Sequence, residues 1–347
     1  MRGNITGRIG GEMNFSELND RNLAERTKQY AYNECVNWPR IAAEASKHPM
    51  SVSSLPALWK TPALIVGSGP TLDDAIPHFN QFNGVIFCSI SQINILEKWG
   101  IAPDFVVALD SADDAADILL DEHSNLSSSI LLTFPGISPR ILERWPSRVR
   151  YFRLIGDPLD EARFPWIDTQ FPMLGSVNNT EVIIANFFHC DPIVLAGVDY
   201  CFPGGRTRAQ DYRRRGPYIF EPKLLQYAET EEGKTTSSEE QLFYANILLA
   251  FWKAFKMNLV QVGDRGAMEE IPRISVEDLA RPIVVPALPE NFWSDVVDKD
   301  MIAMGLYANV QGSVVNLHYK DRDKEIAENL YDTYLEANKW AEFWRDK

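Results

Sequence analysis

The stretch "PALIVGSGPTLDDAIPHF", residues 62–79, decides the fold class of this chain. An apolar run, Ala63–Val66, leads directly into Gly-Ser-Gly-Pro-Thr, and a helical pattern follows. An apolar run that ends in glycines ahead of a helix is typical of a strand-to-helix turn in a parallel sheet. The turn has so few side chains that it either packs closely against other backbone or receives a ligand.

Six further apolar runs recur along the chain and predict more strands. They lie at Val85–Ile90, Phe105–Leu109, Ile130–Phe134, Val149–Leu154, Ile193–Gly197 and Leu259–Val262. Many lack the alternation of a one-sided sheet, as expected for strands buried on both faces. Helical patterns fall between them at Ser91–Trp99, Thr180–Phe188 and Glu239–Phe255. This alternation predicts an α/β fold, with a mostly parallel sheet and helices on both faces.

The sequence predicts three parts. Residues 61–280 form the α/β core. An N-terminal helical extension, residues 1–60, carries a helix at 16–37, and a C-terminal extension, residues 281–347, ends in an amphipathic helix at 321–344. The apolar stripe of that closing helix would pack on the core or on a second subunit, which would make the protein a homo-oligomer.

Composition narrows the class of protein. The chain has 347 residues and a formal net charge of −14, which argues against non-specific binding to nucleic acid or to an anionic membrane. Its four cysteines are far apart and form no C-x-x-C pair, which predicts a reducing, cytoplasmic setting and no structural zinc. No apolar run is long enough for a membrane span, and the N-terminus lacks the apolar region of a signal peptide.

The turn after the first strand is a candidate phosphate site, because ligands of open α/β sheets bind at the carboxyl ends of the strands. Gly67 and Gly69 would let the backbone approach a phosphate, and Thr71 would cap the next helix with its hydroxyl. The turn is neither a Walker A motif nor a Rossmann fingerprint, since Leu72 stands where the third glycine belongs. A tight turn without a ligand therefore stays an alternative.

Other polar residues follow other predicted strands or begin a helix. They are Ser89, Ser91 and Gln92, then Asp110 and Ser111, then Gly175, Ser176, Asn178 and Asn179, and finally Asp199 and Tyr200. Hydroxyls and amides suit a ribose and a base edge, and the carboxylates Asp110 and Asp199 suit Mg²⁺ carried by a polyphosphate. We expect these loops, Ser68 included, to converge on one crevice.

A basic segment follows Asp199 in a chain that is otherwise acidic. Its arginines are Arg206, Arg208, Arg213, Arg214 and Arg215. Guanidinium groups pair with phosphate oxygens, and Gly204-Gly205 would let this segment close over a polyphosphate as a flap. The alternative is a solvated loop that pairs with nearby acids.

The ordered motifs resemble one superfamily. They are "ALIVGSGPTLDDAI" (63–76), "GIAPDFVVALDSAD" (100–113), "LGSVNNTEVIIANFFHCDPIVLAGVDYCF" (174–202) and, more weakly, "LVQVGDRGAMEEIP" (259–272). The superfamily contains the archaeal 6-hydroxymethylpterin diphosphokinases (MptE-like), the motility accessory factors that glycosylate flagellin and, more distantly, bacterial sialyltransferases. The resemblance implies that residues 61–280 are the Rossmann-like, nucleotide-binding core of a nucleotide-dependent transferase. It places the nucleotide phosphates at Gly67, Ser68, Gly69, Pro70 and Thr71. It also implies Ser89, Ser91 and Gln92 near the sugar or base, and Asp199 beside the transferred group.

Two functions follow from the resemblance, and the missing histidine together with the aromatic closing helix favours a third. The first is transfer of a pyrophosphoryl group from Mg²⁺-bound ATP to a hydroxyl, with Asp110 and Asp199 holding the metal or drawing the acceptor's proton. The second is glycosyl transfer from a CMP-activated nonulosonic acid; the sialyltransferase-like members use a histidine base, and the segment that follows Asp199 here contains none. The third is a non-catalytic nucleotide-binding protein.

Overall fold

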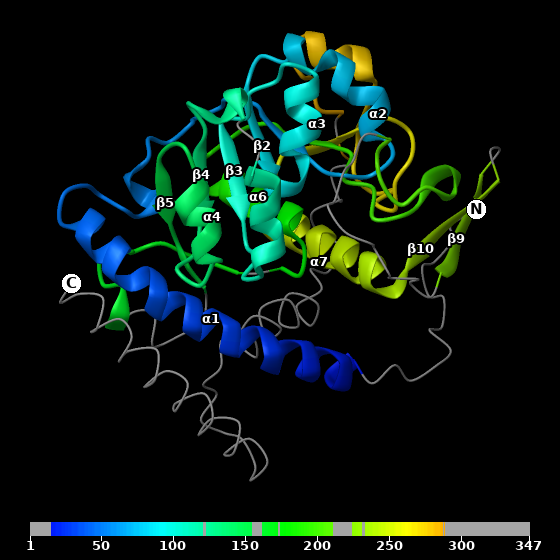
Figure 1. Cartoon of the computed structure of the whole chain (residues 1–347). Coiled ribbons are helices and arrows are strands. Elements are labelled where there is room, and N and C mark those ends of the chain that lie inside the picture. The colour runs from blue at the N-terminus through cyan, green and yellow to red at the C-terminus, as the bar shows by residue number, and fades with distance from the viewer. Residues whose placement is uncertain are drawn as a thin grey trace.

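An eight-stranded parallel sheet forms the centre of the computed structural model (Figure 1). The structure describes residues 15–120, 123–154, 162–172, 174–210, 224–230, 233–286 and 288. The strands are β1 (Ala63–Val66), β2 (Val85–Ser89), β3 (Phe105–Ala108), β4 (Ile130–Thr133), β5 (Val149–Tyr151), β8 (Ile193–Ala196), β11 (Leu259–Val262) and β12 (Arg273–Ile274). Their order across the sheet is β12-β11-β8-β1-β2-β3-β4-β5.

The central strands are covered on both faces. Every residue of β1, β3, β4, β8 and β11 is buried, as expected for a parallel sheet between helical layers. The α-helices that connect or cover the strands are α2 (Leu72–Ala75), α3 (Ile93–Lys98), α4 (Pro139–Arg144), α6 (Val177–Phe187) and α7 (Glu239–Phe255). α6 packs on β1, β2 and β3. The predicted α/β fold with a mostly parallel sheet is confirmed.

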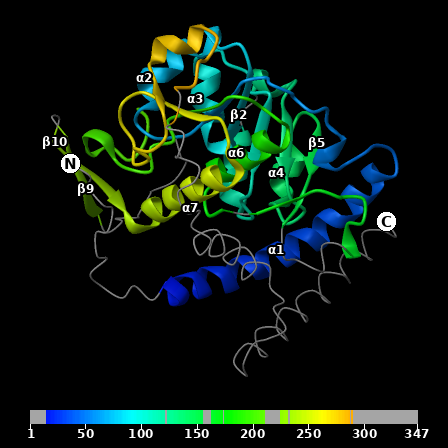
Figure 2. The same ribbon diagram turned by 180° about the vertical axis from the view of Figure 1, so that it is seen from behind.

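Two small sheets lie beside the main one. β9 (Leu224–Thr230) and β10 (Gly233–Ser238) form an antiparallel hairpin that leads into α7 and projects from the body in both views (Figures 1 and 2). β6 (Arg153–Leu154) pairs with β7 (Gln170–Phe171). The single strand predicted at Val149–Leu154 is therefore wrong: the chain leaves the main sheet at Phe152, and Arg153 N–H donates to the carbonyl of Thr169 (2.8 Å).

The first helix is longer than predicted. α1 spans Phe15–Ala45 and continues through Pro39, although an interior proline costs about 3 kcal/mol. The continuation is stabilised by burial, because Ile41 is fully buried in the main core. The side-chain amide of Asn33 donates to the carbonyls of Ser111 (2.9 Å) and Gly136 (3.0 Å). The N-terminal segment is therefore packed into the core of the sheet domain.

Asn37 makes a second contact of this kind between α1 and the sheet domain, and its substitution should lower the stability of the protein. Its amide nitrogen donates to the carbonyls of Pro135 and Ile137, both at 2.8 Å. Asn37→Ala leaves two carbonyls without this donor, so we expect the free energy of unfolding to fall by about 2–3 kcal/mol in a urea titration. Arg40→Ala on the same helix removes only a half-exposed ion pair and should change it by less than about 0.5 kcal/mol. Equal effects of the two would contradict this account of α1.

The remaining sequence predictions concern the C-terminal helix, the last three arginines of the basic segment, the cysteines and membrane spans. The predicted closing helix at 321–344 and Arg213, Arg214 and Arg215 lie outside the described residues. The four cysteines are free and buried. Within the described ranges, no helix combines the length and apolar character that a membrane crossing requires.

Candidate functional site

The carboxyl ends of β1 and β8 lie side by side and form the centre of the candidate site. The two strands pair in parallel, with Val66 opposite Ala196, so that Gly67 and Gly197 face each other beyond the last paired residues. From β1 the chain continues to β2 on one side, and from β8 to β11 on the other. This is the switch point of the topology, where open α/β sheets bind their ligands.

A pocket lies at this switch point and draws on four separate segments of the chain. Its lining residues are Ser68, Gly69, Ser176, Asn178, Gly197, Val198, Asp199, Tyr200, Cys201, Phe202, Thr207, Arg208 and Gln241. The structure thus brings seven of the predicted residues together: Ser68, Gly69, Ser176, Asn178, Asp199, Tyr200 and Arg208. Their chemical roles remain predictions.

Close packing accounts for both glycines of the opening turn. A Cβ atom at Gly67 would overlap the carbonyl group of Gly197, and one at Gly69 would overlap the carboxylate of Asp199. The turn after β1 and the turn after β8 are therefore in backbone contact, which only glycine allows.

The backbone N–H groups of this turn are also used within the protein. Three of them have acceptors: Gly67 N–H donates to Ala196 O (2.8 Å), Gly69 N–H to Gly197 O (2.7 Å) and Thr71 N–H to Asp199 Oδ2 (3.0 Å). Pro70 has no N–H to donate. The turn predicted to cradle phosphates thus directs these donors to the β8 side, and its contribution to the pocket lining comes from Ser68 and Gly69.

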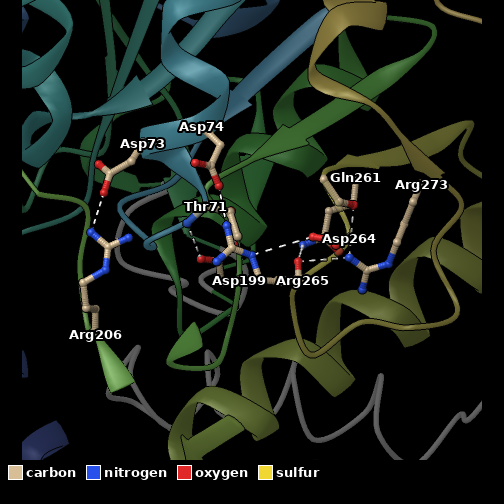
Figure 3. A network of polar contacts seen from close by, with 10 residues as sticks. Thr71, Asp73, Asp74, Asp199, Arg206, Gln261, Asp264, Arg265 and Arg273 are labelled. Carbon is tan, nitrogen blue, oxygen red and sulfur yellow. Dashed lines mark hydrogen bonds and ion pairs between the residues drawn. The ribbon is translucent and has the colours of Figure 1, made fainter. Parts of the chain in front are cut away.

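Asp199 links the two turns from a buried position. Both its oxygens accept hydrogen bonds from Thr71, one from the backbone N–H and one from the hydroxyl (Figure 3). The predicted capping of α2 by the Thr71 hydroxyl is therefore wrong, because the hydroxyl binds Asp199 instead. Burial raises the pKa of Asp199 to about 6, with the Thr71 bonds, Arg265 and Arg273 acting in the opposite direction.

Asn179 and Gly175 support the pocket from behind. Asn179 is fully buried; its amide nitrogen donates to the carbonyls of Leu174 (3.1 Å) and Tyr244 (3.0 Å), and its Oδ1 accepts from the Tyr200 hydroxyl (2.6 Å). Its two amide donors and its oxygen thus all have partners inside the protein, and Asn179 positions Tyr200. Tyr200 has a φ of +50°, a left-handed conformation that is unusual for an aromatic residue. Gly175 abuts the ring of Tyr244 just ahead of α6.

The start of α6 and Arg208 make the pocket suitable for an anion. Ser176 is the N-cap of α6, and its side chain makes no capping hydrogen bond. The first N–H groups of a helix have no partner within the helix and carry partial positive charge. Ser176, Asn178 and Arg208 line the same pocket, so the start of α6 and a guanidinium side chain border one ligand volume.

Arg206 and its neighbours hold the segment predicted as a flap. Arg206 pairs with Asp73 (2.6 Å), the N–H of Gln210 donates to the same carboxylate (2.8 Å), and Ala209 N–H donates to Ser68 O (2.9 Å). Asp74 is paired with Arg265 on the other side of α2 (Figure 3). Arg206 thus fastens the segment to α2, while Arg208 reaches the pocket.

Two groups of predicted residues lie apart from the pocket. Ser89 and Gln92 form a capping box at the start of a 3₁₀ helix, and the hydroxyls of Ser89 and Ser91 are 2.8 Å apart. Asp110 and Ser111 follow β3, and the Ser111 carbonyl accepts from Asn33 of α1. Among the lining residues none of these five is present.

The two carboxylates predicted to share a metal are not neighbours. β3 and β8 are three positions apart in the sheet, which is about 14 Å at the usual strand spacing. Within the described part of the chain, no group of three or more His, Cys, Asp or Glu side chains could hold a metal ion. The residues present do not fit a magnesium ion held jointly by Asp110 and Asp199.

Some site residues were missed by sequence reasoning. Cys201, Phe202, Thr207 and Gln241 line the pocket. Glu181 is fully buried, and its Oε2 accepts a hydrogen bond from Asn178 (2.8 Å). One signal was available, since an acidic residue stands inside the apolar part of "VNNTEVIIANFF", where a helix facing a sheet should be uncharged.

Comparison with known proteins agrees with the motifs. Residues 37–205 match the family described as 6-hydroxymethylpterin diphosphokinase MptE-like. The solved structure of the MAf glycosyltransferase from Magnetospirillum magneticum AMB-1 is similar in fold, with a TM-score of 0.53 at 20% identity. That match covers 84% of this chain and 42% of that protein. No curated protein matches the sequence. The family match covers just under half of the chain and agrees with the resemblance carried by the motifs, and the similar solved structure agrees with the α/β fold.

Proposed function

We propose that this MptE-like chain transfers a group from a nucleotide donor to a hydroxyl, in the pocket between β1 and β8. The observation that carries the proposal is that the N-terminus of α6 and Arg208 line one pocket together with neutral hydroxyl groups. The helix start and the guanidinium would hold the donor's phosphate, since both favour negative charge. Ser68 and Ser176 would add hydroxyl donors beside it.

ATP is the first candidate donor, and the family match supports it. In that reaction the acceptor oxygen forms a bond to the β-phosphorus of ATP, the bond between the β-phosphorus and the oxygen bridging to the α-phosphorus breaks, and AMP leaves. Arg208 would stabilise the negative charge that spreads over the phosphate oxygens in the transition state. The acceptor's proton then needs a base in the pocket.

Asp199 is the candidate for that base. With a pKa of about 6 it is mostly ionised at neutral pH. Each carboxylate oxygen accepts one bond from Thr71 and retains a further lone pair. Asp199 lines the pocket, so it would take the proton from the acceptor hydroxyl as the new bond forms.

A CMP-activated nonulosonic acid is the second candidate donor. The similar solved structure belongs to a protein described as a glycosyltransferase. Arg208 is the one arginine among the lining residues that the structure describes, and a single guanidinium suits the single phosphate of such a donor. Here the bond between the sugar and the phosphate would break, and CMP would leave.

A thermal-shift panel distinguishes the donors. A ligand at 100 times its Kd stabilises the folded state by about 2.7 kcal/mol, which is about 4 °C in Tm for a chain of this size. We expect that rise with ATP if the protein is a diphosphokinase and with CMP if it is a glycosyltransferase, each compared with and without Mg²⁺. Arg208→Gln should remove most of the rise, whereas Arg281→Gln, at an exposed position away from the pocket, should keep it.

No shift with any of the nucleotides in the wild-type protein would reject nucleotide binding at this pocket. A shift without turnover of any acceptor would favour a nucleotide-binding protein without catalysis.

A further inference from the structure

A glutamate is buried next to the candidate pocket, and none of the ion pairs in the described part of the chain includes it. Glu181 of α6 has no exposed surface. The charge of Glu181 acts on two titratable groups nearby, Cys88 of β2 and Tyr200 after β8, and burial is the larger cause that raises the pKa of both. The other strands against which α6 packs, β1, β3, β7 and β8, carry no titratable side chain.

The carboxyl group of Glu181 is suited to be neutral at ordinary pH. Burial raises its pKa to about 8, and the hydrogen bond from Asn178 acts in the opposite direction. Within the described chain its Oε1 has no hydrogen-bond partner. A buried carboxylate oxygen without a partner is costly, whereas the neutral acid keeps one carbonyl oxygen to accept from Asn178.

Glu181 determines which atoms Asn178 can offer to a ligand. The amide nitrogen of Asn178 donates to Glu181 Oε2 (2.8 Å) and approaches the carbonyl of Val66 (3.4 Å). A carboxamide has two N–H donors and one oxygen acceptor. Both donors are directed into the protein, so the carbonyl oxygen is what Asn178 presents to the pocket it lines.

We infer that Glu181 is a positioning residue that holds the side-chain amide of Asn178 with its oxygen toward the pocket. This oxygen then selects a hydroxyl group of the ligand. The inference rests on the proposed function and refines it. A carbonyl oxygen repels phosphate oxygens and accepts from O–H groups. A phosphate at the start of α6, near Ser176, brings its attached ribose within reach of Asn178 two residues along the helix. The assigned partner is therefore a ribose hydroxyl of the donor nucleotide.

The positioning step can be tested without any ligand. Carbon-13 NMR of labelled glutamate carboxyl groups should show one signal that titrates near pH 8 and is missing from Glu181→Gln. The side-chain NH₂ signal of Asn178, identified by its loss in Asn178→Ala, should shift with the same midpoint. Titration of Glu181 near the ordinary pKa of about 4.3 would overturn the inference, and so would an Asn178 NH₂ signal that does not shift when Glu181 titrates.

The ligand's hydroxyl is tested with ATP and CMP against their 2′-deoxy and 3′-deoxy forms. Wild type should bind one deoxy form about five- to tenfold more weakly than the ribonucleotide, since one hydrogen bond is lost. Glu181→Gln keeps an acceptor for the Asn178 amide and should retain that discrimination, whereas Glu181→Leu should lose it. Thr180→Val, a buried change on the same helix that leaves Asn178 untouched, serves as the control.

Equal binding of ribo and deoxy forms by wild type, or retained discrimination in Glu181→Leu, would overturn the assigned hydroxyl. Loss of discrimination in Thr180→Val would show that any disturbance of α6 has the same effect, and would overturn it too. If wild type binds none of these nucleotides, the proposed function fails, while the NMR titration still decides whether Glu181 positions Asn178.

Discussion

Asp199→Ala is expected to lower the rate of group transfer at least about 100-fold. The variant lacks the base that we propose for the acceptor hydroxyl, and general-base catalysis typically contributes about 10²–10⁴-fold. It also leaves the N–H and the hydroxyl of Thr71 without their buried acceptor, so the Tm should fall as well. The measurement is AMP or CMP release with a panel of hydroxyl acceptors, together with the Tm of each protein.

Two further measurements separate the chemical role of Asp199 from its structural role. Asp199→Asn keeps the shape of the side chain but cannot accept a proton, so its rate should stay low even where its Tm is close to that of wild type. The wild-type rate should rise with pH through about pH 6, as the base ionises. Asp264→Asn, at an exposed position near the same edge, is the matched control and should keep full activity. Full activity in Asp199→Asn would remove Asp199 from the mechanism.

The pKa of Asp199 also predicts how stability depends on pH. Its folded-state pKa, about 6, lies above the ordinary value of 3.8, so the folded protein holds this proton more tightly than the unfolded chain. The stabilising contribution of the protonated form is fully present below about pH 4 and is lost as the pH rises to about 6. The Asp199→Asn variant should lack this component of the pH dependence.

Gly67→Ala is expected to destabilise the fold by about 3 kcal/mol or more. The new methyl group would overlap the backbone carbonyl of Gly197, which cannot move aside as a flexible side chain can. The clash would separate the ends of β1 and β8, so ligand binding should be lost together with stability. Urea unfolding measures the first effect and the thermal-shift panel the second.

Gly100→Ala is the matched control for this change. Gly100 has a φ of +68°, but nothing lies within 4 Å of a Cβ built there, so the cost should be limited to backbone strain of about 1 kcal/mol. A Gly67→Ala protein as stable as Gly100→Ala would mean that the two turns are not in the close contact described here.

Local signals in the sequence were sufficient for most of the main sheet. β1 and β11 begin and end where their apolar runs predict, because a run of buried aliphatic residues depends on nothing outside itself. α7 likewise spans the predicted Glu239–Phe255. The division of Val149–Leu154 could not be predicted, because it depends on a second partner, Thr169–Phe171, which has no strand signal of its own.

The sequence predicted which loops meet at the site, but it predicted their individual hydrogen bonds less well. Thr71 has the local signature of a helix cap, yet its hydroxyl binds Asp199, a partner 128 residues away that no local pattern reveals. The pair Ser89 and Gln92 has the spacing of a capping box, and that local interpretation accounts for both residues without a ligand.

The position of β1 in the sheet bears on how the protein is made. The strands β1 to β5 come from one continuous stretch, and β8, β11 and β12 are added later in the sequence to the open edge of β1. During synthesis from the N-terminus, β1 is therefore an unpaired edge until β8 has left the ribosome. Thr71 and Asp199 belong to opposite sides of that seam, so a nascent chain acquires its binding pocket only when the seam closes.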